Sequence, residues 1–141
     1  MTATIDPTTP EGARALESLA GDKTGWLTTI DATGQPQSSP IWFLWGDGEI
    51  LIYSNRRARR NAHVGDRPLV SFNLNTDASG DQLVIMEGVA RIDPDGPSAS
   101  DNPTYLAKYQ EHIEAYGWTV DWFATEYPVV LRVTPTRVRV G

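Results

Sequence analysis

Apolar residues recur along the chain at two spacings, which divide it into strand-like and helix-like stretches. Alternating or continuous apolar runs bounded by turn residues predict β-strands. The first five such runs are GWLTTI (25–30), QPQSSPIWFLW (35–45), EILIYS (49–54), PLVSFNL (68–74) and QLVIMEGVARI (82–92). PVVLRV (128–133) and TRVRV (136–140) then close the chain as one bent strand or two short ones.

Turn residues and prolines suggest how the first strands are connected. DATG (31–34) and GDG (46–48) are typical of turns, so we expect the first three strands to form a meander. Pro36 and Pro40 lie within the second strand, and proline cannot donate to a central ladder. We therefore expect that strand at an edge, or with a stretch of its backbone free for another group. Gly88, inside the fifth strand, predicts a bulge or bend.

Helix-like spacing marks the N-terminal and C-terminal parts of the chain. Residues 9–22 favour a helix with Thr9 as its cap, Pro10 at its first position and an apolar stripe of Ala13, Leu16 and Leu19. Residues 104–117 predict the main helix, begun by Asn102 and Pro103 and ended by Gly117. Its apolar side consists of Tyr105, Leu106, Tyr109, Ile113 and Tyr116. Shorter helical turns are expected at 56–66 and at 119–127.

The order of these elements indicates the fold class. Six or seven strands in short hairpins, with one main helix late in the chain, predict a small antiparallel barrel with helices packed outside it. The class is therefore α+β and mainly β. At 141 residues the chain is expected to form a single domain, residues 1–141, with a flexible N-terminus at residues 1–9.

Composition excludes several classes of function. The content of 40% hydrophobic and 21% charged residues is that of an ordinary soluble globular protein. No apolar stretch approaches the roughly 18 residues that span a bilayer, and the N-terminus lacks the pattern of a secretory signal. We therefore expect a cytoplasmic protein without membrane contact. The chain has no cysteine, and its two histidines, His63 and His112, lie far apart, so no metal site is expected.

Positive charge is concentrated in one segment of an acidic chain. The formal net charge is -6, yet five of the twelve lysines and arginines fall between Arg56 and Arg67. Three interpretations compete: a solvated helix face, a nucleic-acid patch, or a clamp for the phosphate of a small molecule. The acidic balance argues against nucleic acid as a partner, because nucleic-acid-binding proteins usually present a basic face.

The phosphate clamp has a structural rationale. A helix that begins at RRARR, directly after the strand at 49–54, would point unpaired N–H groups at an anion. Ser54 and Asn55 stand where a cap would be, and the guanidinium groups of Arg56, Arg57 and Arg60 add charge-assisted contacts. A solvated helix face remains the alternative. The absence of a Walker A loop and of G-x-G-x-x-G disfavours nucleoside triphosphates.

Catalytic motifs are not evident. The chain contains neither G-x-S-x-G nor H-E-x-x-H. His63 is either a helix histidine packed locally, the favoured interpretation, or a neutral hydrogen-bonding group, while His112 is expected at the surface. Strand alternation places Glu87 in solvent. If the protein is an enzyme, a bound cofactor is therefore expected to supply the reactive chemistry.

The motifs in order resemble a known family. GWLTTIDATGQPQSSPIWFLW, GEILIYS, RRARRNAHVGDRPLVSF, EGVARI and YPVVLRVTPTRVRV resemble the pyridoxamine 5'-phosphate oxidase-like flavoproteins. Within them, the chain is most similar to the actinobacterial branch assigned to the deazaflavin coenzyme F420. The resemblance covers residues 10–141. It implies a split β-barrel of the FMN-binding type and a homodimer with cofactor sites at its interface.

The resemblance also implies roles for individual residues. Ser38, Ser39, Pro40, Ile41 and Trp42 would run along the cofactor ring, and Tyr53, Ser54, Asn55, Arg56 and Arg57 would surround its phosphate. Arg60 stands where the family usually has lysine, and His63 where it usually has asparagine.

F420 is the expected cofactor and FMN the alternative. F420 carries a tail of several carboxylates, and the further arginines Arg59 and Arg67 favour it. The expected activity is that of an F420-dependent oxidoreductase, which transfers a hydride between F420 and a small organic acceptor. The alternatives are an FMN-binding oxidase or flavin reductase, and a non-catalytic module that binds a deazaflavin or a haem-like anion. Solvent or Tyr53 would deliver the proton, and Trp42, Trp118 and Trp122 are candidates for the substrate opening.

Overall fold

The computed structural model describes residues 2–141, whose seven strands form one antiparallel sheet curled into a half-barrel. The order across the sheet is β2-β1-β5-β6-β7-β4-β3. The strands are β1 (Gly25–Ile30), β2 (Pro36–Ile41), β3 (Leu44–Gly46), β4 (Glu49–Ser54), β5 (Leu69–Leu74), β6 (Val84–Ile92) and β7 (Val129–Val140). The helices are α1 (Pro10–Gly21), α2 (Arg60–Asp66), α3 (Pro103–Ala115) and α4 (Val120–Glu126), with a 3₁₀ turn η1 (Ala99–Asp101) before α3. The predicted class, a mainly β α+β barrel with helices outside, is confirmed.

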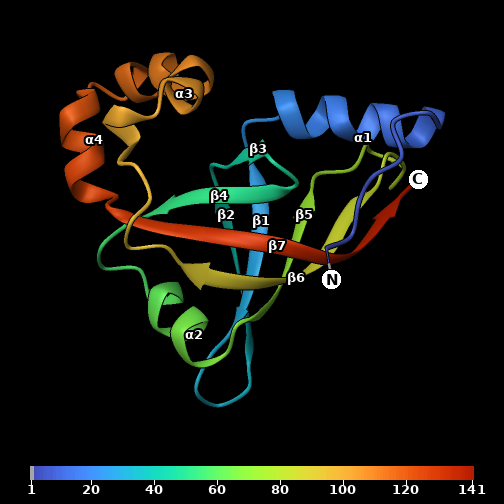
Figure 1. The fold of residues 1–141 in the computed structure, drawn as a ribbon, viewed down its shortest axis with the longest axis horizontal. Helices are drawn as coiled ribbons and strands as arrows, with labels where there is room; N and C mark the ends of the chain where they lie inside the picture. Colours follow the sequence, from blue (N-terminus) through green and yellow to red (C-terminus); the bar gives the residue numbers. More distant parts are fainter. Residues whose placement is uncertain (1) are drawn as a thin grey trace.

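α3 and α4 lie at one end of the sheet and α1 at the other, while α2 packs against β1 and β6 below them (Figure 1). Figure 1 shows α3 and α4 together at the left end, beside the start of β7, and α1 near the C-terminus. Residues 2–9 lead into α1, and the Ala3 amide donates to the carbonyl of Pro135 on β7 at 2.8 Å. Residue 1 lies outside the described residues, and the flexibility of the N-terminus stays a prediction.

The predicted second strand is broken, and the predicted meander is wrong. β2 ends at Ile41 and pairs with β1, whereas β3 begins at Leu44 and pairs with β4 at the other edge of the sheet. Between them, Phe43 gives its backbone groups to α3. Its N–H donates to the Tyr109 hydroxyl at 2.9 Å, and its carbonyl accepts from Lys108 Nζ at 2.9 Å. Because these side chains satisfy the backbone of Phe43, the chain turns a corner there and reaches the opposite edge. The expectation that the proline-bearing strand is an edge is confirmed.

Two helix details differ from the sequence-based expectation. α1 is capped as predicted, since the Gly12 amide donates to the Thr9 hydroxyl at 3.0 Å. Its buried side, however, consists of Gly12, Ala15 and Leu19 rather than Ala13, Leu16 and Leu19. α2 begins only at Arg60 and has no side-chain cap, because residues 56–59 form turns instead. The expected helix start at the Ser54–Asn55 pair is therefore wrong.

The bulge in β6 is where glycine predicted it. The register with β7 shifts between Glu87 and Gly88. A Cβ at Gly88 would lie 2.9 Å from the carbonyl oxygen of Thr134, so the two strands approach too closely for a side chain. Glu87 faces solvent as expected, and β7 is one continuous strand.

The buried side chains form two clusters. One fills the inside of the half-barrel, with Leu27, Phe43, Phe72 and Leu131 among its fully buried members. The second packs β4 against α3 and α4. It contains Tyr53, Tyr105, Tyr109, Ile113 and Phe123 as its largest side chains. This aromatic cluster matters for function because cavity walls are built from it.

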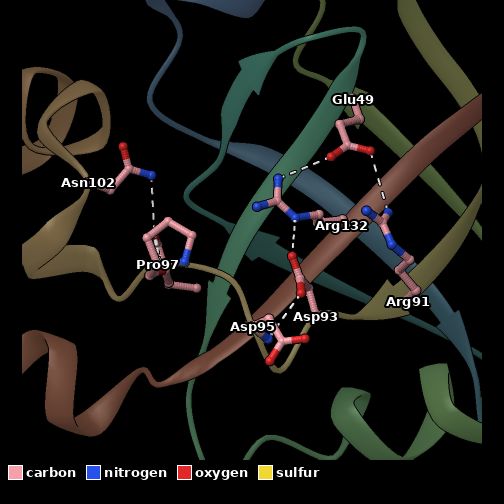
Figure 2. A network of polar contacts seen from close by, with 8 residues as sticks. Glu49, Arg91, Asp93, Asp95, Pro97, Asn102 and Arg132 are labelled. Carbon is pink, nitrogen blue, oxygen red and sulfur yellow. Dashed lines mark hydrogen bonds and ion pairs between the residues drawn. The ribbon is translucent and has the colours of Figure 1, made fainter.

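An ion-pair network crosses β4, β6 and β7. Figure 2 shows Arg132 of β7 between two carboxylates: its Nη1 lies 3.1 Å from Glu49 Oε1, and its Nε lies 2.7 Å from Asp93 Oδ2. Arg91 adds a contact to Glu49 at 3.4 Å. The hydrogen bond from Arg132 is the largest cause that holds the pKa of Asp93 below its usual value. The network anchors the segment after β6, which leads to Pro97 near Tyr53.

Within residues 2–141, none of the helices has the length and apolar character needed to cross a bilayer.

Candidate functional site

Two neighbouring cavities share Ala58 and Arg60 as lining residues. The larger, of about 470 Å³, is called the aromatic cavity, and the smaller, of about 330 Å³, the polar cavity. The aromatic cavity is lined by Thr24, Pro40, Ile41, Trp42, Tyr53, Asn55, Ala58, Arg60, Tyr116, Trp118, Phe123 and Tyr127. The polar cavity is lined by Thr29, Asp31, Gln37, Ser39, Ala58, Arg59, Arg60 and His63. Both volumes lie within the range of roughly 300–1,000 Å³ typical of small-molecule sites.

Arg60 is the charged residue that joins the two cavities. It is the first residue of α2 and is partly buried, and its Nη1 donates to the hydroxyl of Ser54 at 3.1 Å. Ser54 is fully buried at the end of β4. Among residues 2–141, no carboxylate lies within 4.0 Å of the Arg60 guanidinium, and burial lowers its pKa. A partly desolvated cation without a counter-ion at a cavity favours an anionic ligand.

The walls of the aromatic cavity are flat. Trp42 stacks on Phe123 with ring centroids 5.6 Å apart and an interplanar angle of 22°. Trp118 stacks on Tyr116 at 4.7 Å and 18°. Tyr127 stacks on Phe123 at 4.6 Å and 15°. The side chains come from the end of α3, from α4 and from the corner after β2. Such a lining suits a planar conjugated ring.

The corner that breaks β2 and β3 also fixes Trp42. The Trp42 ring stacks on Tyr109 at 4.9 Å, and the hydroxyl of Tyr109 holds the neighbouring Phe43 backbone. His112 meets the Trp42 ring edge-on, with centroids 6.2 Å apart. The expectation that His112 lies at the surface is therefore wrong: it is partly buried, and its Nδ1 has no hydrogen-bond partner among residues 2–141.

Tyr53 lines the aromatic cavity, and its hydroxyl is already engaged. The hydroxyl donates to the carbonyl of Pro97 at 2.8 Å and accepts from the Asn102 amide at 3.1 Å, and Figure 2 shows both partners. Burial raises the pKa of Tyr53 above its ordinary value. Because its proton is committed to Pro97, Tyr53 is poorly placed to protonate a substrate.

The polar cavity contains hydroxyl groups and charges of both signs. Nδ1 of His63 lies 2.9 Å from the Thr29 hydroxyl. Asp31 also lines the cavity. Hydrogen bonds, the largest from Thr33 and the next from Gln37, hold its pKa far below the usual range. An anion in this cavity would therefore be attracted by Arg59 and Arg60 and repelled by Asp31. Among residues 2–141, no group of three histidine, aspartate or glutamate side chains could hold a metal ion.

The structure brings most of the predicted site residues to the cavities. Those at the aromatic cavity are Pro40, Ile41, Trp42, Tyr53, Asn55 and Arg60, and those at the polar cavity are Ser39, Arg60 and His63. Ser38 points elsewhere, with its hydroxyl 2.7 Å from that of Thr28, and Ser54 lies beneath Arg60.

Three of the predicted arginines lie outside both cavities. Arg56 pairs with Glu126, with Nε to Oε2 at 3.2 Å. Arg57 is exposed and lines neither cavity. Arg67 lies 3.9 Å from the carboxylate of its neighbour Asp66. Of the five clustered arginines, only Arg59 and Arg60 thus face a cavity, so the charge available there is smaller than the sequence suggested.

Several lining residues were not expected from the sequence. Those at the aromatic cavity are Thr24, Ala58, Tyr116, Phe123 and Tyr127, and those at the polar cavity are Thr29, Asp31, Gln37 and Ala58. The run of aromatic residues from Trp118 to Tyr127 is the one signal that could have indicated the wall. Trp118 lines the cavity as predicted, whereas Trp122 is 43% exposed and packs on the outer side of Trp118.

The residues present fit a phosphate-bearing cofactor with a flat ring. The fit depends on Arg60, a partly buried guanidinium without a carboxylate partner, at the junction of an aromatic and a polar cavity. A ring in the aromatic cavity would leave its phosphate within reach of this group. Asp31 at the polar cavity is the one feature that opposes an anion.

Comparison with known proteins identifies a matching family. The family model described as pyridoxamine 5'-phosphate oxidase matches residues 12–140. A search of curated proteins returns no match.

Solved structures with the same fold span nearly the whole chain. A conserved hypothetical protein from Mycobacterium tuberculosis is 26% identical, with a TM-score of 0.70 over 99% of this chain and 89% of the other. An F420 reductase is 19% identical, with a TM-score of 0.65 over 87% and 94% of the two chains. A FAD-binding protein from Mesorhizobium loti is 16% identical, with a TM-score of 0.66 over 89% and 90%.

Proposed function

The chain belongs to the pyridoxamine 5'-phosphate oxidase family, and on this premise we propose that it is an F420-dependent oxidoreductase. Its reaction would be the transfer of a hydride between coenzyme F420 and a small organic acceptor. The observation that carries the proposal is the unpaired guanidinium of Arg60 between a flat aromatic cavity and a polar cavity.

The residues that would hold the cofactor follow from the two cavities. The ring would lie in the aromatic cavity along Pro40, Ile41 and Trp42, the last residues of the edge strand and its corner. The phosphate would bind Arg60, with Arg59 and the hydroxyl of Ser39 nearby in the polar cavity. Reduced F420 would supply the hydride, and the chain would supply orientation and an environment that excludes water.

FMN is the alternative cofactor, and the family gives it a specific basis. The matched family is described as an oxidase of a phosphorylated pyridine, and one solved neighbour is a FAD-binding protein, while another is an F420 reductase. The sequence-based argument for F420 was the excess of arginine. Arg59 still supports it, but Arg56 and Arg67 are engaged with carboxylates. The preference for F420 therefore depends mainly on the resemblance of the motifs.

A titration distinguishes the cofactors. F420 and FMN would each be added to the purified chain, and quenching of tryptophan fluorescence would be followed, because Trp42 and Trp118 line the proposed ring site. Saturable quenching by F420 at lower concentration than by FMN is expected. Micromolar binding of FMN without binding of F420 would contradict the deazaflavin proposal. Tight binding with no turnover of any conjugated acceptor would favour a carrier of the cofactor.

A pair of variants tests the residue that carries the proposal. Replacement of Arg60 by alanine should weaken cofactor binding by more than about tenfold, because a charge-assisted contact in a partly desolvated site is lost. Arg14→Ala is the control, since Arg14 on α1 donates to the carbonyl of Gly141 away from both cavities. Equal small effects of the two variants would favour the alternative interpretation of the arginine cluster as a solvated helix face.

The assembly and location are proposed with the function. A homodimer is supported by the exposed apolar side chains of Leu69, Val89 and Ile92 on β5 and β6. Light scattering during size exclusion would measure its mass, and a monomer at micromolar concentration would contradict it. A cytoplasmic location stays a prediction of the sequence.

A further inference from the structure

The aromatic cavity contains three phenols, and they differ in what their hydroxyls bind. Among residues 2–141, the tyrosine hydroxyls that make hydrogen bonds are those of Tyr53 and Tyr109. Tyr53 lines the cavity, but its proton is donated to Pro97. Tyr116 is 65% exposed at the rim. Tyr127 is the partly buried phenol of the cavity whose hydroxyl makes no hydrogen bond with the described chain.

Tyr127 is held firmly even though its hydroxyl is free. It follows the last residue of α4, and its amide donates to the carbonyl of Phe123 at 2.8 Å. Its ring stacks on Phe123 at 4.6 Å. The preceding residue, Glu126, accepts the Arg56 amide at 3.1 Å and the Arg56 side chain, which fixes this end of α4 to the loop before Arg60.

The phenol also lies within electrostatic reach of Arg60. Burial is the main influence on the pKa of Arg60, which it lowers, and Tyr127 partly offsets that effect. Among residues 2–141, no carboxylate lines the aromatic cavity, and Arg60 is its one charged lining residue. A negative charge that formed on the Tyr127 oxygen would therefore meet no carboxylate among the lining side chains, while Arg60 itself would hold the cofactor phosphate.

We propose that Tyr127 donates a hydrogen bond to the carbonyl oxygen of a conjugated acceptor in the aromatic cavity and is the acid that completes its reduction. The inference builds on the proposed function, since hydride transfer needs a matching proton. A reduced deazaflavin or flavin, when bound, would supply a hydride, with its electron pair, to the β-carbon of the acceptor. The C=C electrons move onto the carbonyl oxygen, the Tyr127 O–H bond breaks, and a new O–H bond forms on that oxygen. Water then returns a proton to the phenolate, and the enol becomes the saturated ketone in solvent.

A binding cycle tests the hydrogen bond without any turnover. The probes are 4-phenylbut-3-en-2-one and 1-phenylbut-1-ene, which differ mainly in the carbonyl group. Their affinities for the full chain would be measured by quenching of tryptophan fluorescence. Tyr127→Phe should weaken binding of the ketone by about three- to tenfold, which is the effect of one ordinary hydrogen bond. The affinity for the alkene should stay within about twofold. Tyr105→Phe is the matched control, because Tyr105 lines neither cavity, and it should change neither affinity.

The outcomes separate this inference from the cofactor proposal. An equal change for both probes, no change for either, or no ketone binding to the unaltered chain would overturn the role of Tyr127. If F420 did not bind but the ketone and alkene affinities changed as expected, the cofactor assignment would be wrong. The recognition of the carbonyl by Tyr127 would still stand. With cofactor bound, Tyr127→Phe should lower kcat by about 10²-fold or more, because general acids contribute that much. An unchanged kcat would overturn the catalytic part.

Discussion

Arg56 and Glu126 join the loop after β4 to the last turn of α4 through three contacts. The Arg56 amide donates to the Glu126 carbonyl at 3.1 Å, and its guanidinium Nε and Nη2 donate to the two carboxylate oxygens at 3.2 and 3.4 Å. The sequence places these residues 70 positions apart. Their pairing engages the Arg56 side chain with a carboxylate and holds the aromatic wall against the segment that leads to Arg60. A role for Arg56 at the cofactor phosphate stays a prediction.

Glu126→Gln should loosen α4 without unfolding the chain. The substitution keeps the backbone bond and an acceptor oxygen but removes the charge, which for a partly exposed pair contributes only about 0.2–1 kcal/mol. Hydrogen exchange of the α4 amides should therefore become faster, while exchange in β4 and β7 stays the same. In about 1 M salt the unaltered chain should approach the variant, because exposed charges are screened. Glu87→Gln is the control, since Glu87 pairs with Arg137 far along β6. Unchanged exchange in α4 would mean that packing alone holds the wall.

Tyr109→Phe should destabilise the corner between β2 and β3. The hydroxyl of Tyr109 accepts from the Phe43 amide at 2.9 Å, and Phe43 is fully buried. Without the hydroxyl, that amide would be left unsatisfied, at a cost of about 1–3 kcal/mol. Urea unfolding measures the loss. Tyr116→Phe, at a 65% exposed residue, should leave the midpoint unchanged. If the two variants unfolded alike, the break in the strand would have another cause.

Lys108 should titrate well below an ordinary lysine. Burial, with a smaller effect of nearby Lys23, lowers its pKa to about 8 from 10.5. Its ammonium lies 3.8 Å from the centroid of the Phe43 ring and donates to the Phe43 carbonyl. Because these are the two lysines of the sequence, ¹³C-dimethylation gives two ε-amine signals, which Lys108→Arg assigns. The Lys108 signal should have its midpoint near pH 8, and a midpoint near 10.5 would show that the group is solvated.

The lowered pKa of Lys108 also makes the folding stability depend on pH. Between about pH 8 and 10.5 the unfolded chain still binds the proton that the folded Lys108 has lost. The contribution of Lys108 to folding therefore grows as the pH rises through this window, and is least favourable below pH 8. In Lys108→Met that part of the pH dependence should be absent.

Sequence signals predicted the features that depend on neighbouring residues or on a single glycine, such as a cap, a turn and a bulge. Thr9 caps α1, and the GDG turn places Asp47 and Gly48 at φ of 53° and 74°, conformations that such residues tolerate. Gly88 marks the bulge because no side chain fits against Thr134. The path of the second strand could not be read in the same way. Its break depends on Tyr109 and Lys108, which reach Phe43 from more than 60 positions away.

In the candidate site too, some residues were predictable from the sequence and others depend on contacts between distant segments. The residues of β2 and Arg60 were predicted from the family resemblance, whose motifs cover both segments. The resemblance grouped Arg56 and Arg57 with Arg60, since a sequence does not reveal which arginine finds a carboxylate. Arg56 pairs with Glu126, whereas Arg60 lies at the cavities. Only the packing of α4 distinguishes the two. Tyr127 was missed for a related reason, because it enters the site from the other end of the chain.

Arg60→Lys should preserve most of the cofactor affinity. The resemblance places lysine at this position in the family, and lysine retains the charge while it loses the planar fork that contacts the Ser54 hydroxyl at 3.1 Å. Fluorescence titration with F420 should therefore give an affinity about two- to fivefold weaker for Arg60→Lys, against more than about tenfold for Arg60→Ala. Arg57→Lys and Arg57→Ala form the matched pair at an exposed arginine and should both leave the affinity unchanged. If Arg60→Lys were as weak as Arg60→Ala, paired contacts of the guanidinium rather than its charge would hold the phosphate. If Arg57→Ala were the weaker variant, the phosphate would bind the turn before α2, and the assignment of Arg60 would be wrong.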